Sequence, residues 1–264
     1  TGEPYEIEYR LRHHSGNYRW TLGRALPIIN EPLTIAEEFA MLDNLTAGRF
    51  IAGFVRGLGT EYHASMAIPG FSHERFHEAH DLIVRAWTEI GPFEFEGKHF
   101  HYQYVNVWPR PYQSPHPPIW IGGRSEPALR RVARLGDGWL VSQATPDEAR
   151  AGIAKINSFA TEYGREIDQE HFGALFSFCV ADSPERAREL ASPYLLRRRT
   201  DVDQQALSAF GTPEDVRRLI DRFIDAGVTK FAVRPACPPE LMLDQLEILG
   251  REVVPAYHGA GAPA

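Results

Sequence analysis

The feature that most constrains the fold of this chain is an alternation of short apolar strands with amphipathic helices, which continues through most of its 264 residues. Apolar strands that alternate with helices are typical of a parallel sheet covered by helices. The sequence predicts such strands near Leu26, Phe50, Ile119, Leu140, Phe176 and Ala232. A closed (β/α) barrel needs about eight strands. The pattern therefore predicts either a barrel that lacks two units upstream or an open, doubly wound sheet.

The glycine spacing argues against an open sheet of the dinucleotide-binding kind. That fold places a G-x-G-x-x-G fingerprint directly after a strand. The nearest match here, IAGFVRGLG, has glycines at Gly53, Gly57 and Gly59, which is the wrong spacing. An α/β barrel commonly uses about 250 residues as a single domain. The length of the chain is therefore compatible with a barrel.

The beginning of the chain has a different pattern. Apolar and polar residues alternate on both sides of a turn at Ser15-Gly16-Asn17, which predicts a β-hairpin. The stretch EPYEIEYRLRHHSGNYRW resembles the last hairpin of a PAS sensor domain. We therefore expect residues 1–25 to form a PAS-like hairpin and residues 26–264 to form the barrel domain. Because Thr1 does not start an ordinary reading frame, we also expect further sequence upstream.

Composition excludes several classes of function. The net charge of −7 argues against nucleic acid or an anionic membrane as a partner, because both require a basic surface. Cys179 and Cys237 are far apart and lack metal-ligand spacing, so neither a disulfide framework nor a zinc site is indicated. No apolar run approaches the roughly 20 residues of a membrane span. We therefore expect a soluble, cytoplasmic protein that acts on a small-molecule substrate.

One junction between a strand and a helix combines residues that suit an anion. In IWIGGRSEPALRR an apolar strand ends at Gly122 and Gly123, and Arg124 and Ser125 precede a helix-forming run. Backbone N–H groups at a helix N-terminus, together with the helix dipole, attract an anion. Glycine allows close approach, the arginine adds a charge, and the serine hydroxyl can donate. The junction fits either an anion site or a helix that Ser125 caps.

Three stretches resemble the luciferase-like flavin-dependent monooxygenases, a family of TIM-type (β/α) barrels. In the family's order they are NEPLTIAEEFAMLDNLTAGRFIAGFVRG, YVNVWPRPYQSPHPPIWIGGRSEPALRRVARLGDGW and GTPEDVRRLIDRFIDAGVTKFAVRP, the last followed by REVVP. The resemblance begins at the family's third strand. It implies an α/β fold in which a TIM-type barrel is incomplete, with the N-terminal β-hairpin in front of it.

The resemblance also implies where a cofactor would bind. The junction at residues 122–125 would hold the phosphate of reduced flavin mononucleotide (FMN). The strand RFIAGFV would end beside the flavin ring, with Gly53 and Val55 as cofactor-binding residues. In relatives a glycine is usual where Val55 stands. Arg56 would act in catalysis by stabilising negative charge on the reduced flavin; the alternative is a loop charge paired with Glu61.

The activity implied by the resemblance is oxidation of a small organic substrate by reduced flavin and dioxygen, with a flavin reductase as a further candidate partner. Two alternatives stay open. One is hydride transfer with a deazaflavin coenzyme, because that group of enzymes shares the barrel and the phosphate loop. The other is a truncated barrel without productive cofactor binding. An open sheet edge beside the strands near Leu26 and Ala232 would favour a homo-oligomer.

Two other site types are not supported. His73 and His77 have the i, i+4 spacing of metal ligands, and the stretch HERFH matches H-E-x-x-H, but beside an amphipathic helix we interpret them as solvent-facing histidines and assign no metal. Glu94 and Glu96 fall on an inserted hairpin, and Asp137 falls at the start of a strand. A barrel glycosidase places its acids at the carboxyl ends of strands, so the sequence does not predict a hydrolase.

Overall fold

The computed structural model describes residues 5–12, 18–27, 31–57, 69–195 and 199–257. The chain divides into two compact units. The first consists of Thr1–His13 and Arg19–Gly122, and the second consists of His14–Tyr18 and Gly123–Ala264. Each unit contains parallel strands with helices between them, so the α/β class predicted from the sequence is confirmed.

The described strands of the first unit include four that are neighbours in the order β1-β2-β3-β6. They are β1 (Tyr5–Arg12), β2 (Tyr18–Pro27), β3 (Phe50–Val55) and β6 (Ile119–Gly122). β2 pairs with β3, and β3 pairs with β6, both in parallel. The second strand of the expected hairpin and the strand expected near Leu26 are one element, because β2 runs without a break past residue 25. The division into a PAS-like hairpin at residues 1–25 and a barrel domain at residues 26–264 stays a prediction.

Two helices of the first unit carry part of its apolar core. They are α1 (Pro32–Leu45) and α3 (Ser72–Thr88). Phe39 of α1 lies against Phe50 and Phe54 of β3, with ring centroids 4.9 and 6.0 Å apart. All three rings are buried, so α1 is held to the sheet by aromatic contact.

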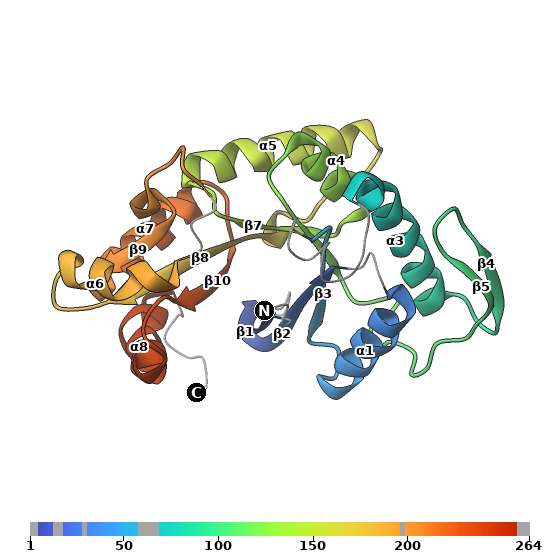
Figure 1. Ribbon diagram of the computed structural model, residues 1–264, viewed down its shortest axis with the longest axis horizontal. Helices are drawn as coiled ribbons and strands as arrows, with labels where there is room; N and C mark the ends of the chain where they lie inside the picture. The colour runs from blue at the N-terminus through green and yellow to red at the C-terminus, as the bar shows by residue number, and fades with distance from the viewer. Residues whose placement is uncertain (1–4, 13–17, 28–30, 58–68, 196–198, 258–264) are drawn as a thin grey trace. The chain divides into compact units, whose positions relative to one another are not determined.

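The insertion predicted between two strand-helix units is a separate antiparallel pair. It consists of β4 (Phe93–Glu96) and β5 (His101–Val105), which lie beside α3 (Figure 1). The carboxylate of Glu78 on α3 accepts hydrogen bonds from the backbone N–H groups of Lys98 and Phe100, at 2.9 and 2.6 Å. One acidic side chain therefore ties the turn of this hairpin to the helix.

The described strands of the second unit are all parallel. They are β7 (Gly138–Ser142), β8 (Phe172–Val180), β9 (Ser208–Gly211) and β10 (Lys230–Pro235). β8 is the centre of this arrangement, because it pairs with each of the other three. All six predicted strands are present, and β9 is a further one that the sequence did not predict. Its four residues, SAFG, include a single large apolar side chain, so they show no apolar run.

Four of the five described α-helices of the second unit have a proline at their first or second position. The five helices are α4 (Glu126–Leu135), α5 (Pro146–Glu162), α6 (Pro184–Ala191), α7 (Pro213–Asp225) and α8 (Met242–Ile248). Thr145 and Glu148 form a reciprocal capping box at the start of α5. Such a box satisfies two N–H groups that a helix start leaves without partners. In Figure 1, α4 and α5 lie side by side along β7.

The strands of the second unit have two distinct faces. Phe176 of β8 and Phe231 of β10 both contact Phe223 of α7, with ring centroids 5.9 and 6.4 Å away. Because side chains alternate along a strand, the residues next to these two phenylalanines point away from α7. Ser177 and Arg234 have the parity of that second face.

Candidate cofactor site

The predicted phosphate junction is a tight turn between β6 and α4. Gly123 has a backbone φ of +119°, which residues other than glycine rarely adopt. A Cβ atom at this position would lie 2.8 Å from the Cβ of Ala128. The carbonyl of Gly123 accepts a hydrogen bond of 2.8 Å from the indole N–H of Trp139. Glycine is thus required here for both conformation and space, and Trp139 fixes the turn.

Ser125 stands at the N-cap of α4 without capping it through its side chain. Its carbonyl accepts hydrogen bonds from the N–H groups of Ala128 and Leu129, at 2.8 and 3.0 Å. Its exposed hydroxyl makes no capping hydrogen bond. Pro127 has no N–H group, so the first turn presents the N–H groups of Ser125 and Glu126. The side-chain cap that the sequence left open is not formed, and the hydroxyl is free of that role.

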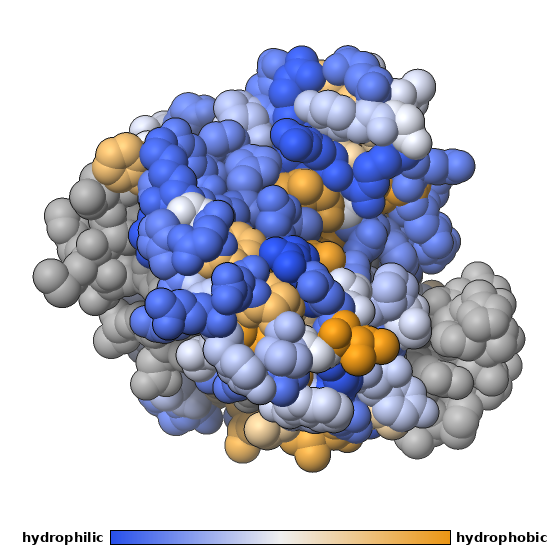
Figure 2. All heavy atoms as spheres, turned by 90° about the vertical axis from the view of Figure 1, so that its right-hand side faces the viewer, coloured by the Kyte–Doolittle hydropathy of each residue, from blue (hydrophilic) through white to orange (hydrophobic). Residues whose placement is uncertain are grey.

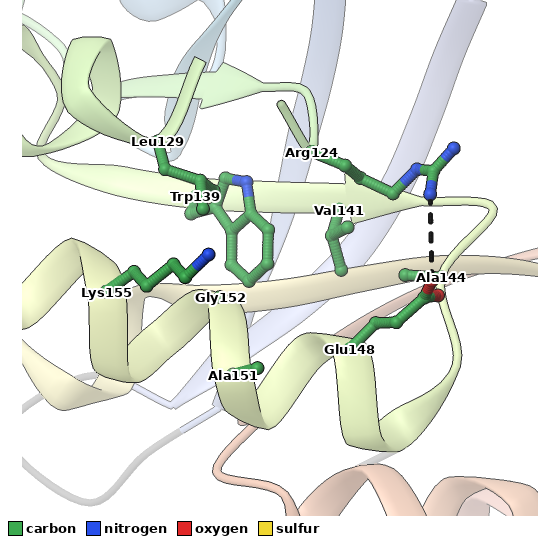
Figure 3. Close-up of a pocket in the computed structure, with 9 residues that line it drawn as sticks. All are labelled: Arg124, Leu129, Trp139, Val141, Ala144, Glu148, Ala151, Gly152 and Lys155. Atoms are coloured by element: carbon green, nitrogen blue, oxygen red, sulfur yellow. Dashed lines mark ion pairs between the residues drawn. The ribbon is translucent and has the colours of Figure 1, made fainter. Parts of the chain in front are cut away.

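Arg124 points toward Glu148 at the start of α5 (Figure 3). Its Nη1 atom lies 3.9 Å from a carboxylate oxygen of Glu148, and more than a third of each side chain is exposed. At this distance the two groups form an ion pair, but the nitrogen and oxygen atoms are too far apart for a hydrogen bond. The guanidinium of Arg124 therefore keeps most of its donors available.

Glu148 is held elsewhere by shorter contacts. Nη1 of Arg199 lies 2.9 and 2.7 Å from its two carboxylate oxygens, and the N–H of Thr145 donates to it at 2.8 Å. Burial alone would raise the pKa of Glu148. The hydrogen bonds from Arg199 and Thr145, with the charges of Arg199 and Arg124, outweigh burial and lower that pKa below its usual value. Glu148 thus stays ionised, with its oxygens occupied.

Arg199 connects three parts of the second unit. Its side chain is 7% exposed. Besides Glu148 it contacts the carboxylate of Asp201 at 2.6 and 3.0 Å and the carbonyl of Gln143 at 3.1 Å. These hydrogen bonds lower the pKa of Asp201 to about 2, with the charge of Arg199 adding to them. They also raise the pKa of Arg199 above its ordinary value.

A shallow hollow of about 190 Å³, open to solvent, lies against this cluster. Figure 3 shows Arg124 and Glu148 at one end and Lys155 of α5 at the other, with Trp139 and Val141 of β7 between them. Its lining is completed by Leu129, Ala144, Ala151 and Gly152. The hollow has an ion pair at one end, a lysine at the other and an apolar floor between them, and all of its lining residues belong to the second unit.

The other predicted site residues lie in the first unit. Gly53 and Val55 are half-buried on β3, and Arg56 follows as an exposed residue. Because β3 and β6 are parallel and in contact, their carboxyl ends meet at one edge of the sheet, where Gly122 ends β6. Glu61, the alternative partner of Arg56, lies outside the described residues.

Sequence reasoning missed Glu148, Arg199 and Trp139. The pattern Thr145-Pro-Asp-Glu148 is a capping-box signal and could have drawn attention to Glu148. Nothing in the run RRRT identifies Arg199, because its carboxylate partner is 51 residues away in the chain. The contact between Trp139 and Gly123 likewise forms only when β7 lies next to the turn.

The family model described as luciferase-like monooxygenase matches residues 21–230. The chain belongs to this family. It is therefore an oxidoreductase of the luciferase-like type, as its resemblance to these proteins predicted, and it shares their TIM-barrel type of fold. None of the described helices is long and apolar enough to cross a membrane. Among the described residues, no three histidine, cysteine or acidic side chains are grouped in a way that could hold a metal ion.

Individual relatives of the luciferase-like family use different coenzymes. The chain is 24% identical to a 5,10-methylenetetrahydromethanopterin reductase of Methanopyrus kandleri, over 89% of this chain and 81% of that protein. It resembles the structure of an F420-dependent secondary alcohol dehydrogenase, with a TM-score of 0.73, 20% identity and coverage of 86% and 76%. It also resembles the oxygenating constituent of 3,6-diketocamphane monooxygenase from Pseudomonas putida in complex with FMN, with a TM-score of 0.69, 18% identity and coverage of 87% and 77%.

Proposed function

We propose that this luciferase-like protein binds reduced FMN and uses dioxygen to oxidise a small organic substrate. The observation that carries the proposal is the turn at residues 122–125. It offers the backbone at Gly122 and Gly123, the hydroxyl of Ser125, which does not cap the helix, the N-terminus of α4 and the guanidinium of Arg124. These are the donors that a phosphate requires, and the residues present therefore fit the group.

We assign the roles of the protein's own groups from the resemblance to the family. Arg124 and Ser125 would donate to the phosphate, and Trp139 would keep the turn in its binding shape through Gly123. Gly53 and Val55 would lie beside the flavin ring, and Arg56 would stabilise negative charge on it. When bound, the reduced flavin would supply two electrons to dioxygen, so that one oxygen atom can enter the substrate and the other can leave as water.

A deazaflavin coenzyme is the second candidate. It is favoured by the likeness to the F420-dependent secondary alcohol dehydrogenase and to a coenzyme F420-dependent tetrahydromethanopterin reductase from Methanopyrus kandleri. Such a coenzyme would exchange a hydride with the substrate, and dioxygen would not be consumed. Oxygen uptake during turnover distinguishes the two functions, because only the FMN reaction requires it.

The phosphate site is tested by comparing FMN with riboflavin, which lacks the phosphate. Arg124→Ala and Ser125→Ala should each weaken FMN binding by about 1.5 to 3 kcal/mol, the value of a hydrogen bond to a charged group. Riboflavin binding should change much less. Fluorescence titration of both ligands measures this. Equal losses for FMN and riboflavin would show that the turn has a structural role and that the phosphate binds elsewhere.

A further inference from the structure

Three polar side chains form one row across β9, β8 and β10. Ser208 is in register with Ser177, and Ser177 is in register with Arg234. Residues that are paired in register point to the same face of a sheet. Since Phe176 stacks on Phe223 of α7, this row lies on the face turned away from α7. In a (β/α) barrel that face is the interior one.

Two atoms of this row are buried without a hydrogen-bond partner. Ser177 and Ser208 are each 3% exposed, and Arg234 is half-buried. Nη2 of Arg234 donates to the hydroxyl of Ser177 at 3.3 Å and to the carbonyl of Tyr194 at 2.9 Å. Within the described part of the chain, the hydroxyl of Ser208 and Nε of Arg234 have no partner. Buried polar atoms are normally paired, so such exceptions require a reason.

The row also carries an unbalanced charge. The hydrogen bonds of Arg234 go to a hydroxyl and a carbonyl, and no carboxylate of the described residues forms an ion pair with it. Removing a guanidinium from water without an opposite charge is costly. An anion that accepts from Arg234 and from Ser208 would satisfy both the charge and the unpaired donors.

The rows on the two sides of this one differ in their side chains. Toward the amino ends of the strands lie Ser142, Leu175 and Ala232, and Ser142 is exposed. Toward the carboxyl ends the row is bordered by an apolar cluster that includes Cys179 and Phe210 and is packed against α6. The row therefore has an apolar wall on one side and Ser142, Leu175 and Ala232 on the other.

We propose that Arg234, with Ser177 and Ser208, binds the carboxylate or sulfonate group of an organic anion, and that the substrate of this enzyme carries such a group. The statement that this anion is the substrate rests on the proposed function. The bidentate geometry of arginine suits both groups. The apolar wall suits the carbon chain of such a molecule.

The test measures the binding of sodium butyrate and of uncharged butyramide to the purified full chain by calorimetry at constant ionic strength. Butyrate should bind, and butyramide should bind at least about tenfold more weakly, because a charge-assisted hydrogen bond is lost. Arg234→Met should lower butyrate affinity about tenfold or more, and Ser208→Ala should lower it several-fold. Arg222→Met, which alters an exposed arginine on α7, is the matched control and should bind butyrate as the native protein does.

Two further binding measurements, with longer carboxylates and with inorganic sulfate, identify the class of ligand. Affinity should rise from acetate to octanoate, whereas inorganic sulfate should bind more weakly than butyrate. Equal affinity for butyrate and butyramide, tight binding of sulfate, or unchanged butyrate affinity in both Arg234→Met and Ser208→Ala would each overturn the proposal. FMN affinity, measured separately, should be the same in the native protein and Arg234→Met. If the native protein does not bind FMN, the proposed function is refuted, but the binding of butyrate at Arg234 is not.

Discussion

At the scale of single residues, the candidate site depends on which carboxylate Arg124 can reach. Glu148 lies 3.9 Å from it, yet the shorter contacts of Glu148 all go to Arg199 and Thr145. Arg199 therefore competes with Arg124 for the same carboxylate. Its effect is to keep Arg124 available for an external anion.

Removing Arg199 should accordingly weaken FMN binding although Arg199 does not itself touch the phosphate turn. In Arg199→Ala, Glu148 would turn toward Arg124 and neutralise it, so FMN affinity should fall about tenfold, close to the loss of one charge-assisted hydrogen bond. The double variant Arg199→Ala with Glu148→Gln should regain most of this affinity, because the competing charge is gone. Fluorescence titration measures both. Equal FMN affinity in the single and double variants would assign Arg199 a purely structural role.

The same ion pairs predict a dependence of stability on acid. The folded-state pKa of Asp201 is about 2 and that of Glu148 is also lowered. Their stabilisation is fully present above the unfolded pKa values, which are about 4, and is lost as pH falls through the lowered folded values. The thermal midpoints of native protein and Arg199→Gln should therefore differ most above about pH 5 and converge near pH 2. If the thermal midpoints of the two proteins differ by the same amount at pH 2 and at pH 5, the ion pairs do not produce this acid dependence.

At the scale of elements, the turn before α4 is fixed by its glycine and by a neighbouring strand. Gly123→Ala should destabilise the protein by about 2 to 4 kcal/mol, since an unfavourable backbone conformation and a steric contact add together. Gly164→Ala is the control, because Gly164 also has a positive φ of +66° but no atom lies within 4 Å of the added Cβ. It should cost about 1 kcal/mol. Urea denaturation measures both, and equal costs would show that the contact with Ala128 relaxes freely.

At the scale of the whole molecule, one exposed apolar patch belongs to the first unit. The end of α1 lies next to the segment after β5, because the side-chain amide of Asn44 donates to the carbonyl of Arg110 at 2.6 Å. Leu45, Trp108 and Tyr112 are all exposed there, at 75%, 66% and 63%. Figure 2 shows apolar atoms exposed among polar ones on the side of the molecule that it faces. Exposed apolar patches mark interaction surfaces.

We expect this patch to take part in self-association. The native chain should elute as a homo-oligomer in size-exclusion chromatography with light scattering, and Leu45→Glu should lower its mass, because a charge would be buried at the contact. Leu243→Glu changes an equally exposed leucine (78%) on α8 and should leave the mass unchanged. A monomeric native protein at all concentrations would rule out this assembly.

The sequence by itself determined the α/β class, the positions of the six apolar strands and the family. Each of these depends on local periodicity or on motifs contained in one contiguous stretch, such as IWIGGRSEPALRR. β9 was missed because SAFG has one large apolar side chain and therefore no apolar run. Only the tertiary structure decided which carboxylate faces Arg124, since Arg199 and Glu148 meet from distant parts of the chain. It alone aligned Ser208, Ser177 and Arg234, because strand register is set by packing between strands and not by any one strand's sequence.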